Sequence, residues 1–79
     1  MTEFEPSDVV RIQQLAIPSR EVDGASANPP QPRVGDVGIV IDALGDDIYL
    51  VEHTTDDGHP VWVAEFHAVE LSLINRGEP

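Results

Sequence analysis

The side chains best suited to metal or acid–base chemistry are the histidines and two pairs of adjacent aspartates. In the stretch "TDDGH", His59 follows Asp56 and Asp57 closely, and an imidazole with two carboxylates is a donor set that transition metals accept. Adjacent aspartates in a turn point apart, however, and Asp-Gly is typical of a tight hairpin turn. We therefore predict a turn here and no metal site. His53 is expected to lie half-buried and neutral in the sheet, and His67 is expected to cap or pack against a 3₁₀ turn.

The sequence offers no set of residues for covalent or general acid–base catalysis. It contains no cysteine, and none of its serines lies beside a histidine or in the glycine elbow that activates a nucleophile. Asp46 and Asp47 belong to a second expected turn, and nothing places two carboxylates across a cleft. We predict that the protein is not an enzyme and that it has no catalytic residues and no cofactor.

Two glycines in the stretch "RVGDVGIVI", residues 33–41, raise the question of a phosphate-binding loop. A dinucleotide fingerprint needs glycines between a strand and a helix, and a Walker loop needs a lysine. Here the glycines lead directly into a β-branched segment, and the chain has no lysine. Structural roles fit better. We expect Gly35 and Asp36 to turn the chain into a strand, and Gly58 to complete a hairpin turn. Gly38 is expected to permit a bulge, a sharp bend or a close approach of the backbone that a Cβ would obstruct.

The charge balance limits the classes of partner. Fifteen acidic residues stand against four arginines, so the formal net charge is -11. Such a charge repels the phosphates of nucleic acids and anionic lipids. We expect no nucleic acid and no membrane among the partners, and we expect a protein partner with a basic surface. The acidic segment 1–8 lacks the apolar core of a signal peptide, so a cytoplasmic location is expected.

The pattern of apolar and turn-forming residues predicts an all-β chain with a long first loop. Residues 8–15 favour a strand, although a short helix starting at Ser7 stays an alternative. The stretch 18–33 is rich in proline and small polar residues, and it is expected to be a mobile loop that the fold does not need. We interpret its Pro29–Arg33 segment as a part of the loop that proline makes stiff, and not as a ligand for an SH3 domain. The other expected elements are strands at 37–44, 48–54, 61–65 and 71–74, a 3₁₀ turn within 66–70, and a frayed tail at 75–79. One domain, 1–79, holds all of them.

Several strands are apolar on both faces, which a small protein with one core does not need. We predict that part of the second apolar set forms a partner interface that includes Ile48, Leu50, Trp62 and Phe66. The alternative is that Phe4 and Ile17 cover this set. If Trp62 belongs to the core, the acidic turns become the expected interface, and their residues are Asp46, Asp47, Asp56 and Asp57.

The segments "VGDVGIVIDAL", "IYLVEH", "DDGHPVWVAEF" and "VELSLI" together resemble a small, uncharacterised bacterial family with an SH3-like barrel. More distantly, the chain is similar to the SH3-like barrels of electron-transport accessory proteins, such as the variable chain of ferredoxin-thioredoxin reductase, a photosystem I stromal subunit and the nitrile hydratase β-subunit. The likeness spans Asp8 to Ile74. His53 departs from it, because the family pattern has an aromatic residue there. The resemblance implies a closed, SH3-like barrel of about five strands.

The expected function is that of a non-catalytic interaction or accessory module that binds a basic protein or a second copy of itself. Two alternatives stay open on the sequence. One is an accessory subunit of a cofactor-containing or electron-transfer complex, as the resemblance implies. The other is an acidic antitoxin or immunity protein that blocks a basic enzyme by imitating nucleic acid.

Overall fold

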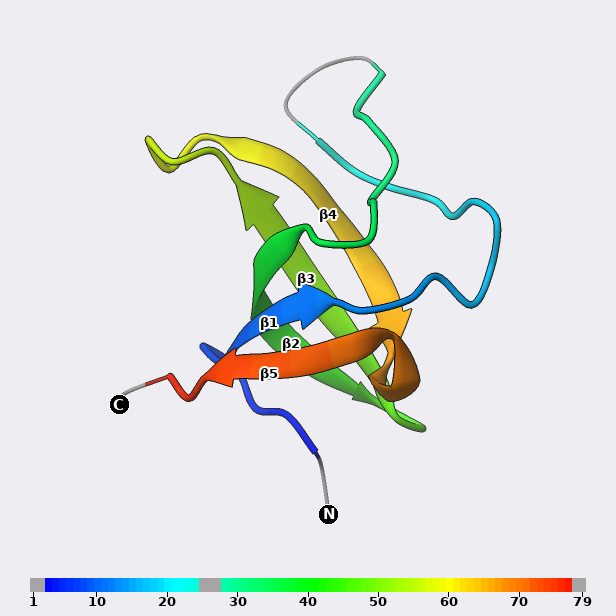
Figure 1. Ribbon diagram of the computed structural model, residues 1–79, viewed down its shortest axis with the longest axis vertical. Helices are drawn as coiled ribbons and strands as arrows, with labels where there is room; N and C mark the ends of the chain where they lie inside the picture. The colour runs from blue at the N-terminus through cyan, green and yellow to red at the C-terminus, as the bar shows by residue number, and fades with distance from the viewer. Residues whose placement is uncertain (1–2, 25–27, 78–79) are drawn as a thin grey trace.

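The chain folds into a single antiparallel sheet (Figure 1), and the computed structural model describes residues 3–24 and 28–77. The elements in chain order are β1 (Val9–Ile12), β2 (Val37–Gly45), β3 (Ile48–Thr54), β4 (Pro60–His67), the 3₁₀ turn η1 (Ala68–Glu70) and β5 (Leu71–Asn75). The order across the sheet is β4-β3-β2-β1-β5. The predicted all-β class, the number of strands and the 3₁₀ turn before the last strand are therefore confirmed. The first segment is a strand and not a helix, although it is shorter than predicted.

Both predicted hairpins are present, and their turns follow from local chemistry. Asp46 and Asp47 have positive φ angles of 55° and 61° and connect the paired residues Gly45 and Ile48. Two consecutive left-handed residues make the tight turn whose twist matches the flanking strands, and aspartate tolerates this conformation better than most residues. The second turn, between β3 and β4, has Gly58 at φ 88°.

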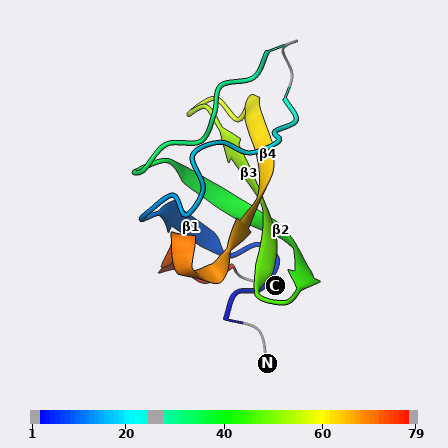
Figure 2. The same cartoon turned by 90° about the vertical axis from the view of Figure 1, so that its right-hand side faces the viewer.

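The sheet bends on itself, so that β1 and β5 lie across the direction of β3 and β4 (Figures 1 and 2). One buried core lies on the inner face, with Val10, Ile12 and Leu71 from β1 and β5 packed into one cluster with Tyr49 and Trp62 from β3 and β4. Within the described residues, however, β4 and β5 form no ladder with each other. The sheet is therefore open where a closed barrel is predicted, because η1 carries the chain from one edge strand to the other without pairing them.

The loop between β1 and β2 is attached to the fold at several points, which corrects the expectation of a dispensable mobile loop. Asp23 and Val63 exchange both backbone hydrogen bonds, at 2.9 and 2.7 Å, so the loop forms a bridge with the free edge of β4. Val22 packs against the core. The side chain of Gln31 bonds the backbone of Arg20 in both directions, at 3.0 and 2.8 Å. Residues 25–27 lie outside the described part of the chain.

These contacts predict different outcomes for two loop replacements. Replacing residues 20–31 with a Gly-Ser linker should lower the stability by about 3–5 kcal/mol, because it leaves the buried Glu70 without Arg20. Replacing only residues 24–30 retains Arg20, Val22 and Asp23, and it should cost about 1 kcal/mol or less, since loop closure depends weakly on loop length. Urea unfolding followed by Trp62 fluorescence measures both values. Equal stabilities for the two variants would contradict this assignment.

The end of the chain also differs from the expected frayed tail. Asn75 belongs to β5, and Arg76 Nη1 lies 2.7 Å from a carboxylate oxygen of Asp8. The Gly77 N–H donates to the other oxygen of Asp8 at 3.0 Å. The segment after β5 is therefore tied to the start of β1, while residues 78–79 lie outside the described part.

Candidate functional site

The outer face of β2, β3 and β4, opposite the core, alternates apolar and acidic side chains in two rows. In the first row Ile39 pairs with Glu52, and Glu52 pairs with Val63. The bridge between Val63 and Asp23 extends this row onto the loop. Residues that pair across antiparallel strands lie on the same face, so the four side chains alternate in apolar and acidic character along the row.

The second row has the opposite order, because Asp42 pairs with Leu50 and Leu50 pairs with Glu65. Its geometry depends on an irregularity in β2 between Val40 and Asp42, where two residues of β2 face one of β3. Both Ile41 and Asp42 are exposed at this bulge, whereas in a regular strand they would point to opposite faces. The bulge therefore adds an apolar and an acidic side chain to the same surface.

Half of the predicted apolar interface lies on this outer face and half in the core. Ile48 and Leu50 are half-buried on the outer face, as the alternation along β3 predicts. Trp62 and Phe66 are each only 1% exposed, which corrects their assignment to a partner interface. They point inward because they pair with His53 and Tyr49, whose side chains face the core. The Trp62 ring stacks on His53 at 5.3 Å and contacts Phe66 at 5.5 Å between ring centroids.

Phe4 and Ile17, the two residues expected to cover the second apolar set, lie in different parts of the structure. Phe4 is buried and packs edge-on against Tyr49 at 5.2 Å between ring centroids, so it completes the core instead of the outer face. Ile17 is 47% exposed and lines the pocket described below. Phe4 therefore does not cover the outer face, and Ile17 borders this face only at the pocket.

The acidic turn residues lie at the two opposite ends of β3. Asp46 and Asp47 follow β2, Asp56 and Asp57 follow β3, and all four are exposed. The structure thus brings neither pair into the alternating rows. None of the four takes part in the salt bridges of the described residues.

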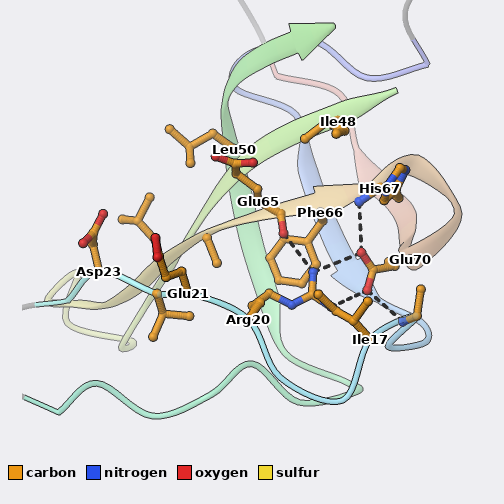
Figure 3. Close-up of a pocket in the computed structure, with 14 residues that line it drawn as sticks. Ile17, Arg20, Glu21, Asp23, Ile48, Leu50, Glu65, Phe66, His67 and Glu70 are labelled. Atoms are coloured by element: carbon orange, nitrogen blue, oxygen red, sulfur yellow. Dashed lines mark hydrogen bonds and ion pairs between the residues drawn. The ribbon is translucent and has the colours of Figure 1, made fainter. Parts of the chain in front are cut away.

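A pocket of about 350 Å³ lies where the outer face meets the loop (Figure 3). Leu50 and Val63 line it from the sheet, and Ile17, Arg20 and Val22 line it from the loop. It is an open hollow between the loop and the edge strand β4, not a hole in the core. No local sequence pattern marks this pocket, because its two walls are far apart in the chain.

Arg20 and Glu70 form a buried ion pair at the base of the pocket. The guanidinium binds the carboxylate through both terminal nitrogens, and the two side chains are only 6% and 2% exposed. Arg20 Nη1 also donates to the Glu65 carbonyl at 2.8 Å, and the guanidinium carbon lies 4.2 Å from the centroid of the Phe66 ring. Such a two-pronged pair satisfies the charge of both groups, so neither is free to bind a ligand.

Glu70 is held by backbone donors as well as by Arg20. The N–H groups of His67 and Ala16 each donate to its carboxylate at 2.9 Å. Burial alone would raise the pKa of Glu70, but the hydrogen bonds and the charge of Arg20 outweigh burial, so the pKa lies below its ordinary value. The ionised carboxylate of Glu70 therefore joins η1 to the end of β4 and to two points of the loop.

Asp8 is the second buried carboxylate, at 2% exposure. Burial would raise its pKa, but the N–H groups of Glu5 and Gly77 and the guanidinium of Arg76 outweigh this, so the pKa of Asp8 is lowered. The Glu5 N–H donates at 2.9 Å. Because the Arg76 side chain is 56% exposed, water screens its charge, and the backbone donors are the more dependable partners.

Both lowered pKa values predict a loss of stability in acid. A group whose pKa is lower in the folded than in the unfolded state stabilises the fold above its unfolded pKa, and this contribution disappears as the pH falls through the folded pKa. Urea unfolding midpoints should therefore stay level from neutral pH down to roughly pH 5 and fall below about pH 4, where unfolded carboxylates titrate. Asp8→Asn should weaken this dependence, whereas Asp56→Asn, at an exposed turn, should not. Identical pH profiles for the two variants would rule out the role given to Asp8.

The glycine and turn residues have the predicted structural roles, and of the roles expected for Gly38 the close approach is the one observed. Gly35 has φ 97°, and the Asp36 carboxylate accepts the Arg33 N–H at 3.0 Å, so the two form the turn into β2. Gly58 also needs its positive φ. Gly38 is not at the bulge. A Cβ there would lie 2.6 Å from Val51 Cγ1 and 2.7 Å from the Glu52 carbonyl oxygen, so glycine is needed for close approach to β3.

The three histidines belong to different segments, namely β3, the second turn and the end of β4. His53 Nδ1 lies 2.6 Å from the Val37 carbonyl oxygen, and the N–H of His59 donates to the Thr55 hydroxyl at 3.1 Å within the second turn. His67 is exposed at the end of β4. Among residues 3–24 and 28–77, no three histidine or acidic side chains come close enough together to hold a metal ion.

Comparison with protein-family models, with curated proteins and with solved structures gives no match to this chain. The function therefore has to be inferred from the geometry of the site itself. Within the described residues, no helix is long and apolar enough to cross a membrane.

Proposed function

We propose that the protein is a non-catalytic interaction module with an SH3-like fold and that its outer face binds a basic protein. The alternating rows of the outer face carry this proposal. Ile39 and Ile41 are 45% and 43% exposed, and burying each against a partner contributes roughly 1 kcal/mol, about half the value for a whole side chain. Their acidic neighbours favour a partner that carries positive charge. The SH3-like assignment is supported by the strand order and by the 3₁₀ turn between the last two strands.

A pair of double variants tests the proposed function. Ile39→Ser with Ile41→Ser removes exposed apolar surface from the outer face. Val34→Ser with Val69→Ser removes exposed apolar surface outside the strands of the sheet, since each of these side chains is 60% exposed. In quantitative affinity capture from lysate of the source cells, the wild type should retain a basic protein, the first variant should retain at least about tenfold less of it, and the second should behave as wild type.

Two results would contradict the proposal. One is retention of the same protein by both variants, which would move the interface away from the outer face. The other is sedimentation of the wild type as a dimer that only Ile39→Ser with Ile41→Ser dissociates, which would make the outer face a contact between two copies. Circular dichroism of each variant checks that the sheet is intact, because the substituted side chains lie outside the core.

A further inference from the structure

The pocket between the loop and β4 combines apolar walls with acidic side chains at its rim. Three exposed carboxylates line it, those of Glu21, Asp23 and Glu65. In Figure 3 the first two lie on the loop side, and the third lies on the sheet side near Leu50. The salt bridges of the described residues include none of the three. Glu70, the fourth acid of the pocket, is neutralised by Arg20.

This combination selects against anions and favours a cation that has an apolar stem. Among the described residues that line the pocket, Arg20 is the only arginine or lysine, and its charge is already paired with Glu70 while it also donates to the Glu65 carbonyl. The walls contributed by Ile17, Leu50 and Val63 suit methylene groups. Lysine and arginine side chains match both requirements, because they bury an aliphatic stem and keep the charged end at the polar rim.

The pocket is also continuous with the outer face. Leu50 and Val63 belong to the alternating rows and to the pocket at once. A partner that lies across the rows would therefore pass the mouth of the pocket at the edge of β4. The bridge between Asp23 and Val63 fixes the acidic rim relative to the sheet, so the site is largely formed before binding.

We propose that this pocket binds one arginine or lysine side chain of the basic partner and so anchors that partner to the outer face. The inference rests on the proposed function, because it names the group by which the partner is recognised. The aliphatic stem contacts Leu50 and Val63, and the cation lies among the carboxylates of the rim.

Titration of ¹⁵N-labelled protein with capped pentapeptides tests the pocket directly. The probe is Ac-Gly-Ala-Arg-Ala-Gly-NH₂, and the controls replace arginine by citrulline, which has nearly the same shape without the charge, or by norleucine, which keeps only the stem. The arginine peptide should cause saturable amide shifts along residues 16–23 and 63–67, with a dissociation constant of about 1 mM, as expected for a single anchor. Both control peptides should bind at least about tenfold more weakly, because they lack the cation.

A matched pair of variants separates the pocket from the overall negative charge. Asp23→Asn with Glu65→Gln removes two rim charges, and Asp56→Asn with Asp57→Asn removes two charges from an exposed turn outside the pocket. The first pair should weaken binding of the arginine peptide at least about tenfold and the second less than about threefold, since exposed charges at a distance are screened. Equal weakening by the two pairs, or equal binding of the arginine and citrulline peptides, would overturn the proposal.

The outcomes distinguish this inference from the proposed function. If Ile39→Ser with Ile41→Ser abolishes capture of the partner while no arginine peptide binds the pocket, the interaction module stands and the anchor is wrong. If the arginine peptide binds as expected while the outer-face variant still captures the partner, the anchor stands and the outer face is wrong. Dimerisation that Asp23→Asn with Glu65→Gln abolishes would assign the pocket to an arginine of a second copy, and it would overturn a separate basic partner.

Discussion

Glu70→Ala is expected to unfold most of the protein or to lower its stability by about 3–5 kcal/mol, which is the usual cost of removing one partner from a buried ion pair. The change removes the acceptor for the Arg20 guanidinium and for the N–H groups of His67 and Ala16. It leaves the Arg20 charge in a site where its side chain is 6% exposed. Because a domain of 79 residues has a stability of only about 4–12 kcal/mol, this loss is a large fraction of the whole.

Glu65→Ala is the matched control, since it removes the same charge from an exposed neighbour whose contact with Arg20 is made by its backbone carbonyl. Its cost should be about 0.5 kcal/mol or less, as for most surface changes. A third variant, Arg20→Met with Glu70→Leu, should be more stable than Glu70→Ala, because no unpaired charge is left in the buried site. Urea unfolding followed by the fluorescence of Trp62 measures all three. A loss below about 1 kcal/mol for Glu70→Ala would show that the pair is not a major support of the fold.

The elements of the sheet could be predicted from the sequence because their signals are local. Alternating residues in "IYLVEHT" define a strand with bounds identical to those of β3, and the turns at Asp46–Asp47 and Gly58 depend on residues that tolerate a positive φ. The alternation also groups Tyr49 with Val51 on one face, as the structure confirms.

The choice of the core face could not be predicted in the same way. Both faces of β3 and β4 carry apolar residues, and alternation identifies two faces without telling which is buried. The pairing of Trp62 with His53 and the bend of the sheet decide this, and both depend on contacts between distant residues. Trp62 and Phe66 were therefore predicted for an interface, although they are core residues.

The candidate site was largely hidden for the same reason. Arg20 and Glu70 are 50 positions apart, and no local pattern marks an arginine in a proline-rich loop as the partner of a glutamate before the last strand. The bulge at Ile41 and Asp42 is likewise unmarked in the sequence, where Gly38 is the residue of this strand that favours a bulge or a bend. What the composition did indicate was the excess of acidic residues, and the outer face and the pocket rim both reflect it.

Gly38→Ala is expected to destabilise the protein by about 1–3 kcal/mol, the usual cost of overpacking, and Gly38→Val by more. The new Cβ would lie 2.6 Å from Val51 Cγ1 and 2.7 Å from the Glu52 carbonyl oxygen. The second contact is with backbone, which cannot rotate away, so β2 has to move away from β3. Gly38 does not have a left-handed φ, and the effect is therefore steric. Protein that remains folded should bind the arginine peptide as the wild type does, because Gly38 does not line the pocket.

A double-mutant cycle with Val51→Ala identifies the cause of this loss. Val51→Ala by itself should cost about 2–4 kcal/mol, since Val51 is fully buried and its truncation leaves a cavity. It removes the Cγ1 atom that the new Cβ would meet, so Gly38→Ala should cost at least about 0.5 kcal/mol less in this background than in the wild type.

Gly58→Ala is the contrasting case, because Gly58 has φ 88° and no atom lies within 4 Å of a new Cβ at this position. Its cost of roughly 1–2 kcal/mol comes from backbone strain, so Val51→Ala should leave it unchanged. Equal costs of Gly38→Ala in both backgrounds would leave only the contact with the Glu52 carbonyl to explain the need for glycine.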